Sequence, residues 1–92
     1  MKTAELTGAA LDWAVSAAQG DSDIHPYSTD WADGGPIIER EKITLEWTGE
    51  NWCAYIRHDE EEFGITPMIA AMRCYVASKL GDNIEIPEEL AQ

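Results

Sequence analysis

Positive charge is scarce in this sequence. Six Lys and Arg residues stand against eighteen Asp and Glu, which gives a formal net charge of −12 at pH 7. A surface of this sign repels the phosphates of DNA and RNA as well as an anionic membrane. We therefore expect no direct nucleic-acid partner and no membrane partner. The charge remains compatible with a basic protein partner, with mimicry of DNA, or with a small ligand held in a pocket of locally positive sign.

Long apolar runs and thiols are scarce as well. No apolar run approaches the roughly 20 residues that a membrane span requires, and residues 1–5 lack the apolar core of a signal peptide. The two cysteines, Cys53 and Cys74, are predicted to be buried thiols in a reducing cytoplasm. Together with His25 and His58 they show no short zinc-type spacing, so we expect neither a metal nor a cofactor.

What the sequence does contain suits one small domain over residues 1–92. The apolar fraction is 45%, with four Trp, enough for one modest core. Residues 6–19 are predicted to form a helix, capped by Thr7 and ended by Gly20. A second helix is predicted to run from the capping pair at residues 66–67 to Gly81. An acidic tail follows at about residues 82–92.

Two alternating segments, residues 43–47 and 52–57, predict a β-hairpin with residues 48–51 as its loop. The expected cross-strand pairs are Trp47 with Trp52, Leu45 with Ala54, and Ile43 with Ile56. A short edge strand is expected at residues 84–86 and a turn of helix at 87–90. Trp13, Trp47 and Trp52 fall on the apolar faces and are expected in the core. The predicted fold is α+β, with the two main helices packed on this small antiparallel sheet.

Residues 21–35 lack periodicity and predict a long loop containing Trp31 and two glycines. Pro36 suits the first position of a helix, so a short helical turn is expected from there to about Glu41. Structureless stretches of this length are uncommon in a compact domain and are often functional.

Three segments of the chain resemble a known family: ELTGAALDWAV (residues 5–15), DWADGGPIIE (30–39) and AAMRCYVASKLG (70–81). They are similar to the small phage and prophage proteins of the NinX-like family, and the resemblance spans nearly the whole domain. It implies an accessory gene of a temperate phage, expressed in the cytoplasm of an infected bacterial host. It implies no catalytic mechanism.

Six residues form the predicted ligand site: Tyr27, Trp31, Gly34, Gly35, Arg40 and Arg73. The glycines would let a ligand approach the main chain, whose N–H groups could accept an anion near a helix start. The two aromatic side chains could stack on a base, and either arginine could bind a phosphate. The alternative is an ordered turn, in which Trp31 plugs the core and the arginines pair with carboxylates or lie along the surface. The glycines do not form a P-loop, because its Gly-Lys-Ser/Thr ending is missing.

These features predict a non-enzymatic phage accessory protein with no catalytic residues. The leading hypothesis is a homo-oligomer that sequesters a small nucleotide-derived host defence signal, of the ADP-ribose or cyclic-nucleotide type. That hypothesis rests on analogy with small phage proteins that act against host machinery. The alternative is an acidic inhibitor or DNA mimic acting on a host protein. A phosphodiesterase using His25 or His58 stays open as a further alternative.

Overall fold

The computed structural model describes residues 1–57 and 60–90. Its elements are the 3-10 helix η1 (Thr3–Glu5), α1 (Gly8–Gln19), α2 (Trp31–Glu41), β1 (Thr44–Trp47), β2 (Trp52–Tyr55), β3 (Glu62–Gly64), α3 (Pro67–Leu80) and the 3-10 helix η2 (Glu88–Leu90). The strands form one antiparallel sheet in the order β1-β2-β3. The predicted α+β class is therefore confirmed.

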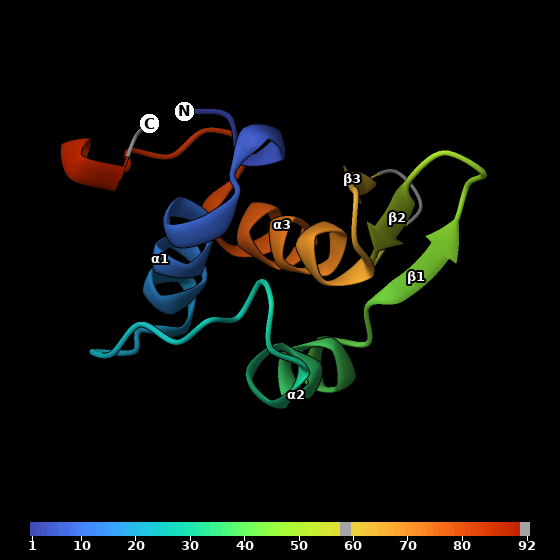
Figure 1. Ribbon diagram of the computed structural model, residues 1–92, viewed down its shortest axis with the longest axis horizontal. Coiled ribbons are helices and arrows are strands. Elements are labelled where there is room, and N and C mark those ends of the chain that lie inside the picture. Colours follow the sequence, from blue (N-terminus) through green and yellow to red (C-terminus); the bar gives the residue numbers. More distant parts are fainter. Residues whose placement is uncertain (58–59, 91–92) are drawn as a thin grey trace.

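Helix α3 lies at the centre of the molecule, with the sheet on one side and α1 on the other (Figure 1). Its buried residues surround the helix: Met68, Ala70, Ala71, Met72, Cys74, Tyr75 and Val76. A helix that is apolar on all sides needs neighbours on all sides. Only α3 packs extensively on the sheet, so the expectation that both main helices cover it is wrong for α1, which packs against α3.

The ends of α3 and the C-terminal end of α1 lie where the sequence predicts them. Helix α1 begins at Gly8, and Thr7 occupies its N-cap position, but the Thr7 side chain makes no capping hydrogen bond among the described residues. Gly20 ends the helix in the left-handed region with a φ of 75°. Thr66 caps α3, because its Oγ1 accepts a hydrogen bond of 3.0 Å from the Ile69 amide. Gly81 follows the last turn of α3 with a φ of 89°.

Helix α2 begins at Trp31, five residues before the predicted start. The side chain of Asp30 accepts a 2.9 Å hydrogen bond from the Ala32 amide and so caps the helix. Pro36 therefore lies inside the helix, not at its first position. Proline has no amide hydrogen and cannot donate to the carbonyl of Ala32 one turn earlier, but the helix continues past it to Glu41.

The predicted loop is correspondingly shorter, and polar side chains of α1 hold it. The Ser16 hydroxyl donates to the carbonyl oxygens of Asp21 and Asp23 at 3.1 and 3.0 Å. One carboxylate oxygen of Asp12 accepts a 2.8 Å hydrogen bond from the Ser28 amide. The segment between α1 and α2 is thus an ordered connection fastened to α1.

The hairpin register is confirmed for the pairs Trp47 with Trp52 and Leu45 with Ala54. Ile43 and Ile56 lie outside the strands. β3 was not predicted, and it pairs with the free edge of β2. Trp13 and Trp52 are partly buried against the core as expected, but Trp47 is 57% exposed and does not belong to it.

The segment after α3 runs beside the beginning of the chain. The Thr3 amide donates to the Asp82 carbonyl at 2.8 Å, and Lys2 and Asn83 form an isolated bridge. The strand predicted at residues 84–86 is absent from the described tail (residues 82–90), whereas the predicted turn of helix is present as η2. Within the described ranges no helix is long and apolar enough to cross a bilayer.

Candidate functional site

A cavity with a volume of about 630 Å³ lies where β3, the start of the chain and the end of α3 meet. We call it the acidic cleft. It is lined by Lys2, Ala4, Glu60, Glu61, Glu62, Ala77, Ser78, Gly81, Asp82 and Asn83. Four of these ten residues carry a carboxylate and one carries an amine, so the cleft has a negative potential.

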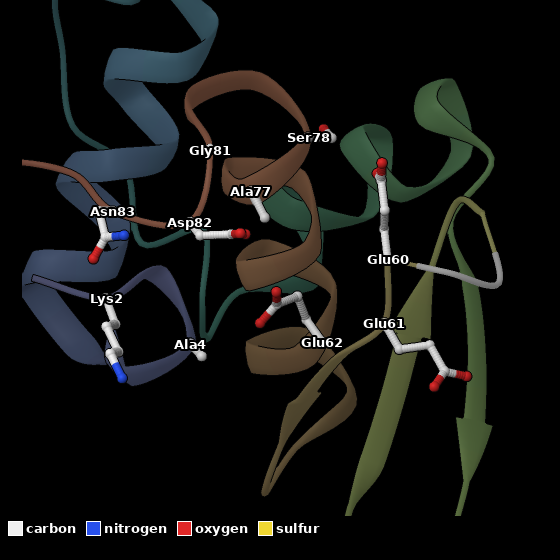
Figure 2. Close-up of a pocket in the computed structure, with 10 residues that line it drawn as sticks. All are labelled: Lys2, Ala4, Glu60, Glu61, Glu62, Ala77, Ser78, Gly81, Asp82 and Asn83. Atoms are coloured by element: carbon white, nitrogen blue, oxygen red, sulfur yellow. The ribbon is translucent and has the colours of Figure 1, made fainter.

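Two carboxylates from different parts of the chain point into the acidic cleft. Figure 2 shows Glu62, from β3, and Asp82, after α3, directed toward the same space, whereas Glu61 turns toward the strands. Burial and, to a smaller extent, the charge of Asp82 raise the pKa of Glu62, while the Arg73 guanidinium acts in the opposite direction. Ionisation of Glu62 is therefore less favourable in the folded protein than in an unfolded chain.

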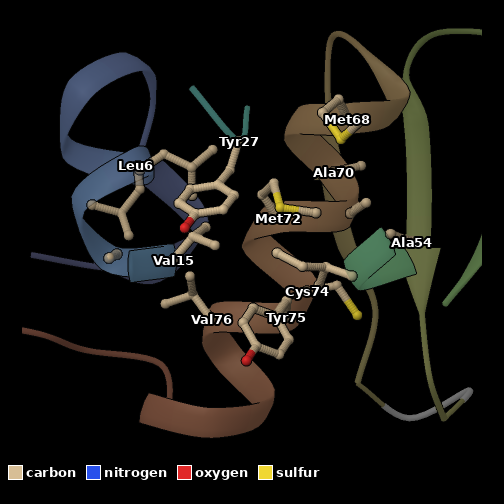
Figure 3. Close-up of a cluster of buried hydrophobic side chains, with 14 of the residues drawn as sticks. Leu6, Val15, Tyr27, Ala54, Met68, Ala70, Met72, Cys74, Tyr75 and Val76 are labelled. Carbon is tan, nitrogen blue, oxygen red and sulfur yellow. The ribbon is translucent and has the colours of Figure 1, made fainter. Parts of the chain in front are cut away.

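Tyr27 belongs to the core and does not offer the stacking surface predicted from sequence. It is 3% exposed, and its ring packs among core side chains beside α3 (Figure 3). Its hydroxyl donates a 2.6 Å hydrogen bond to the Asp21 carboxylate. Burial and this hydrogen bond raise the pKa of Tyr27 to about 12.

The two glycines of α2 differ in their surroundings. A Cβ on Gly34 would lie 2.6 Å from the carbonyl oxygen of Tyr27 and would collide with the Met68 thioether. A Cβ on Gly35 would meet no atom within 4 Å outside α2. Gly34 is thus explained by close packing of α2 on Tyr27 and on α3.

The Arg40 side chain, near the end of α2, already makes hydrogen bonds to neighbouring side chains. Its Nε donates to the Glu41 carboxylate at 2.9 Å, and one Nη donates to the Gln19 side chain at 3.1 Å. The guanidinium carbon also lies 5.6 Å from the centre of the Tyr75 ring. This arrangement agrees with the alternative interpretation, in which the arginine pairs with a neighbouring carboxylate.

Arg73 joins segments that are distant in sequence. Its Nε donates to the Leu6 carbonyl at 2.8 Å, and an Nη donates to the Phe63 carbonyl at 2.6 Å. Arg40 instead lies against Tyr75, two residues along α3, so the two guanidinium groups contact different sides of this helix. The structure does not bring the six predicted residues together in one pocket.

Trp31 is a predicted site residue that does line a pocket. Its side chain, at the start of α2, is 54% exposed, so it does not plug the core. It borders a cavity of about 240 Å³, which we call the Trp31 pocket. The other lining residues are Ser28, Thr29, Thr66, Pro67, Met68 and Ile69. No local pattern in the sequence pointed to these residues, because the pocket is formed where the first turns of α2 and α3 meet.

The cysteines and histidines are the residues that the sequence offers as nucleophiles or soft metal ligands. Cys53 and Cys74 are free and buried, as predicted, and burial raises the pKa of Cys74 to about 11. Its thiol therefore stays protonated at neutral pH. His25 is partly exposed, with its Nδ1 3.9 Å from the Asp33 carboxylate, while His58 lies outside the described residues. In the part of the chain that the structure describes, no group of three or more His, Cys, Asp or Glu could hold a metal ion.

Comparison with known proteins identifies the family. The family model described as "Bacteriophage P22, NinX" matches residues 22–79, which include α2, the sheet and most of α3. Two of the three segments that carry the resemblance, residues 30–39 and most of 70–81, lie inside this match, whereas residues 5–15 lie outside it. No curated protein matches the chain significantly. Because the match covers more than half of the 92 residues, the chain belongs to the NinX family of phage proteins.

Proposed function

We propose that this phage protein acts by binding, without catalysis, and that its target is a basic segment of a protein in the host cytoplasm. The observation that carries the proposal is the acidic cleft, where Glu62 and Asp82 face the same cavity. A Lys or Arg side chain entering the cleft would be attracted by two neighbouring carboxylates and would reduce the repulsion between them. DNA mimicry is the special case in which the bound host surface is one that otherwise binds DNA.

The cost of ionising Glu62 in the free protein supports a cationic target. Burial and the nearby Asp82 charge both raise the pKa of Glu62. A bound cation would favour the ionised carboxylate of Glu62. Part of the binding free energy would then come from relief of the repulsion between Glu62 and Asp82. The net charge of −12 would also speed the encounter with a basic partner.

The test uses an oligolysine peptide as a defined probe and measures its affinity by calorimetry at low salt. The cleft variant combines Glu60→Gln, Glu62→Gln and Asp82→Asn. A matched variant combines Glu39→Gln, Glu85→Gln and Glu88→Gln, which are exposed and lie outside the cleft. Both variants lose the same number of negative charges, so a difference between them reports on the cleft.

We expect the cleft variant to bind at least tenfold more weakly than the wild type, and the matched variant to lose about threefold or less. Salt should weaken the wild-type complex strongly. Equal losses in the two variants would show that the general charge attracts the peptide and that the cleft has no special role. A host protein captured from lysate should follow the same order of affinities, and added double-stranded DNA should displace the phage protein if it is a DNA mimic.

The exposed Trp31 indole favours a second candidate, sequestration of a nucleotide-derived defence signal. The Trp31 pocket offers a surface on which a base could stack, but neither Arg40 nor Arg73 lines it. Native mass spectrometry with cyclic ADP-ribose isomers tests this candidate and also measures the predicted homo-oligomeric state. A stoichiometric mass increment that Trp31→Ala abolishes would support sequestration, and a bare mass with every nucleotide would eliminate it.

A further inference from the structure

Ser28 contains a buried polar atom that the fold does not use. The residue is 3% exposed, and its amide is held by Asp12. Its Oγ, in contrast, has no hydrogen-bond partner among residues 1–57 and 60–90. Buried hydroxyls are nearly always paired, so an unpaired one calls for an explanation. Ser28 lines the Trp31 pocket, and rotation about its Cα–Cβ bond changes the direction in which the hydroxyl points.

The other walls of the Trp31 pocket suit a flat, apolar group. Trp31 presents an exposed indole, while Pro67, Met68 and Ile69 supply apolar surface from the first turn of α3. Indole rings stack favourably on other aromatic rings. The volume of about 240 Å³ is below the range typical of drug-sized ligands, so it suits a single ring system.

The pocket also selects for neutral ligands. None of its lining residues is charged. An ion of either sign would therefore lose hydration without gaining a charged partner. Asp30 caps α2 next to Trp31, and Asp33 lies in the first turn, so carboxylates already occupy the helix end that would otherwise attract an anion.

We infer that the Trp31 pocket binds a neutral aromatic ring carrying a hydrogen-bond acceptor at its edge, with the Ser28 hydroxyl as the donor. The ring stacks on Trp31 and covers Met68 and Ile69. This site is separate from the acidic cleft. It is the pocket on which the sequestration candidate also depends, but it holds the ring alone and offers no charged group for a phosphate. A nucleobase without its phosphate belongs to this ligand class.

Pyridine and benzene form a matched pair of probes, because they have the same shape and only pyridine has a ring nitrogen that accepts a hydrogen bond. The full chain is labelled with ¹⁵N, and the four Trp side chains give separate indole N–H signals. The Trp31 signal is assigned with Trp31→Phe. At neutral pH both probes should shift this signal saturably, and pyridine should bind about fivefold more tightly than benzene.

The Ser28→Ala variant tests the role of the hydroxyl. We expect the preference for pyridine to disappear while the Trp31 signal still responds to both probes. The variant should fold, because it removes a hydroxyl that has no partner and keeps the amide bond to Asp12. The amide spectrum away from the pocket checks this. Trp31→Ala should weaken the binding of both probes, and because this variant lacks the indole signal, binding is measured from the Met68 methyl signal instead.

Two results would overturn the inference. The absence of any saturable shift would show that the pocket does not bind aromatic rings. Equal affinity for pyridine and benzene in the wild type would show that Ser28 does not donate to the ligand, as expected if an ordered water satisfies its hydroxyl.

Further binding experiments distinguish this site from the two proposed functions. Pyridine and adenosine binding without binding of adenosine monophosphate or cyclic ADP-ribose isomers would support the neutral site and eliminate nucleotide sequestration. The cleft variant should bind pyridine like the wild type, because none of its three positions lines the Trp31 pocket.

Discussion

Arg73 stabilises the fold because its guanidinium donates to the carbonyls of Leu6 and Phe63, which belong to segments far apart in the sequence. A planar guanidinium presents several donors in fixed directions, whereas a lysine ammonium is a compact point charge. The geometry of this side chain therefore accounts for an arginine in a chain that has only six basic residues.

Arg73→Lys should destabilise the protein by about 1.5–3 kcal/mol, the range for losing one hydrogen bond to a charged donor. Urea unfolding measures the change. The control is Arg57→Lys, at an exposed position after β2, which should change stability by less than about 0.5 kcal/mol. If the two variants were equally stable, the two carbonyl contacts would contribute nothing and Arg73 would be free to serve a ligand.

Glu62, in contrast to Arg73, is a residue whose charged form lowers the stability of the fold. Its pKa is raised by burial and by Asp82, so the folded state binds the proton more tightly than the unfolded state does. Ionisation of Glu62 therefore destabilises the fold as pH rises from the pKa of the unfolded chain through the raised folded-state pKa. Below the unfolded-state pKa, both states are protonated and the effect is absent.

Glu62→Gln should consequently raise the thermal midpoint at neutral pH, and the gain should vanish below about pH 4, where glutamate is protonated in both states. Calorimetry across this pH range measures it. Glu85→Gln, at an exposed position outside the acidic cleft, serves as the comparison. A loss of stability at neutral pH would mean that attraction between Glu62 and Arg73 outweighs burial and the repulsion from Asp82.

At the scale of elements, helix α2 is where the structure differs most from the prediction made from the sequence. Helices α1 and α3 were predictable because caps and glycine stops bracket a regular apolar pattern. In α2, two glycines and Pro36 lower helix propensity, but packing on Tyr27 and Met68 overrides it. The available signal was Asp30 as an N-cap with another acid three residues later.

β3 was missed because its three residues follow an acidic run and are too few to show a period. It exists through pairing with β2, a contact that no local pattern contains.

The two candidate sites likewise differ in how much of each could be predicted from local sequence. The exposure of Trp31 was foreseeable from its isolation in a polar segment, whereas the acidic cleft joins residue 2 to residues 60–62 and 77–83. The unpaired Ser28 hydroxyl is a property of tertiary packing alone.

The paired glycines of α2 give a prediction with an internal control. Gly34→Ala should destabilise the protein by about 1–3 kcal/mol, because the new methyl group would press on the backbone carbonyl of Tyr27. Gly35→Ala should change stability by less than about 0.5 kcal/mol, because the helix preference of alanine is offset by contact of its Cβ with the ring of Pro36, the next residue, while more distant residues leave the methyl group room. Urea unfolding of both variants measures the contrast. Equal effects would contradict the packing explanation for Gly34.

At the scale of the whole molecule, the net charge of −12 is distributed over a chain with a radius of gyration of only 11.8 Å. Many carboxylates therefore lie within about one Debye length (roughly 8–10 Å) of one another at moderate salt. Self-repulsion of this kind destabilises the compact state relative to the extended chain. The described ion pairs offset little of it, since they involve exposed arginine, lysine and histidine side chains.

Added sodium chloride should accordingly stabilise the protein. Raising the concentration from about 0.05 to about 0.5 M shortens the Debye length to a few ångströms and should increase the free energy of unfolding by about 1–2 kcal/mol. Urea is the suitable denaturant because it is uncharged, and potassium chloride at equal ionic strength should give the same curve.

The cleft variant, with three fewer negative charges, should start from a higher stability at low salt and respond less to added salt. If its salt response equalled that of the wild type, the repulsion would arise outside the acidic cleft. Stabilisation by a bound cation would then not distinguish the cleft from the rest of the surface.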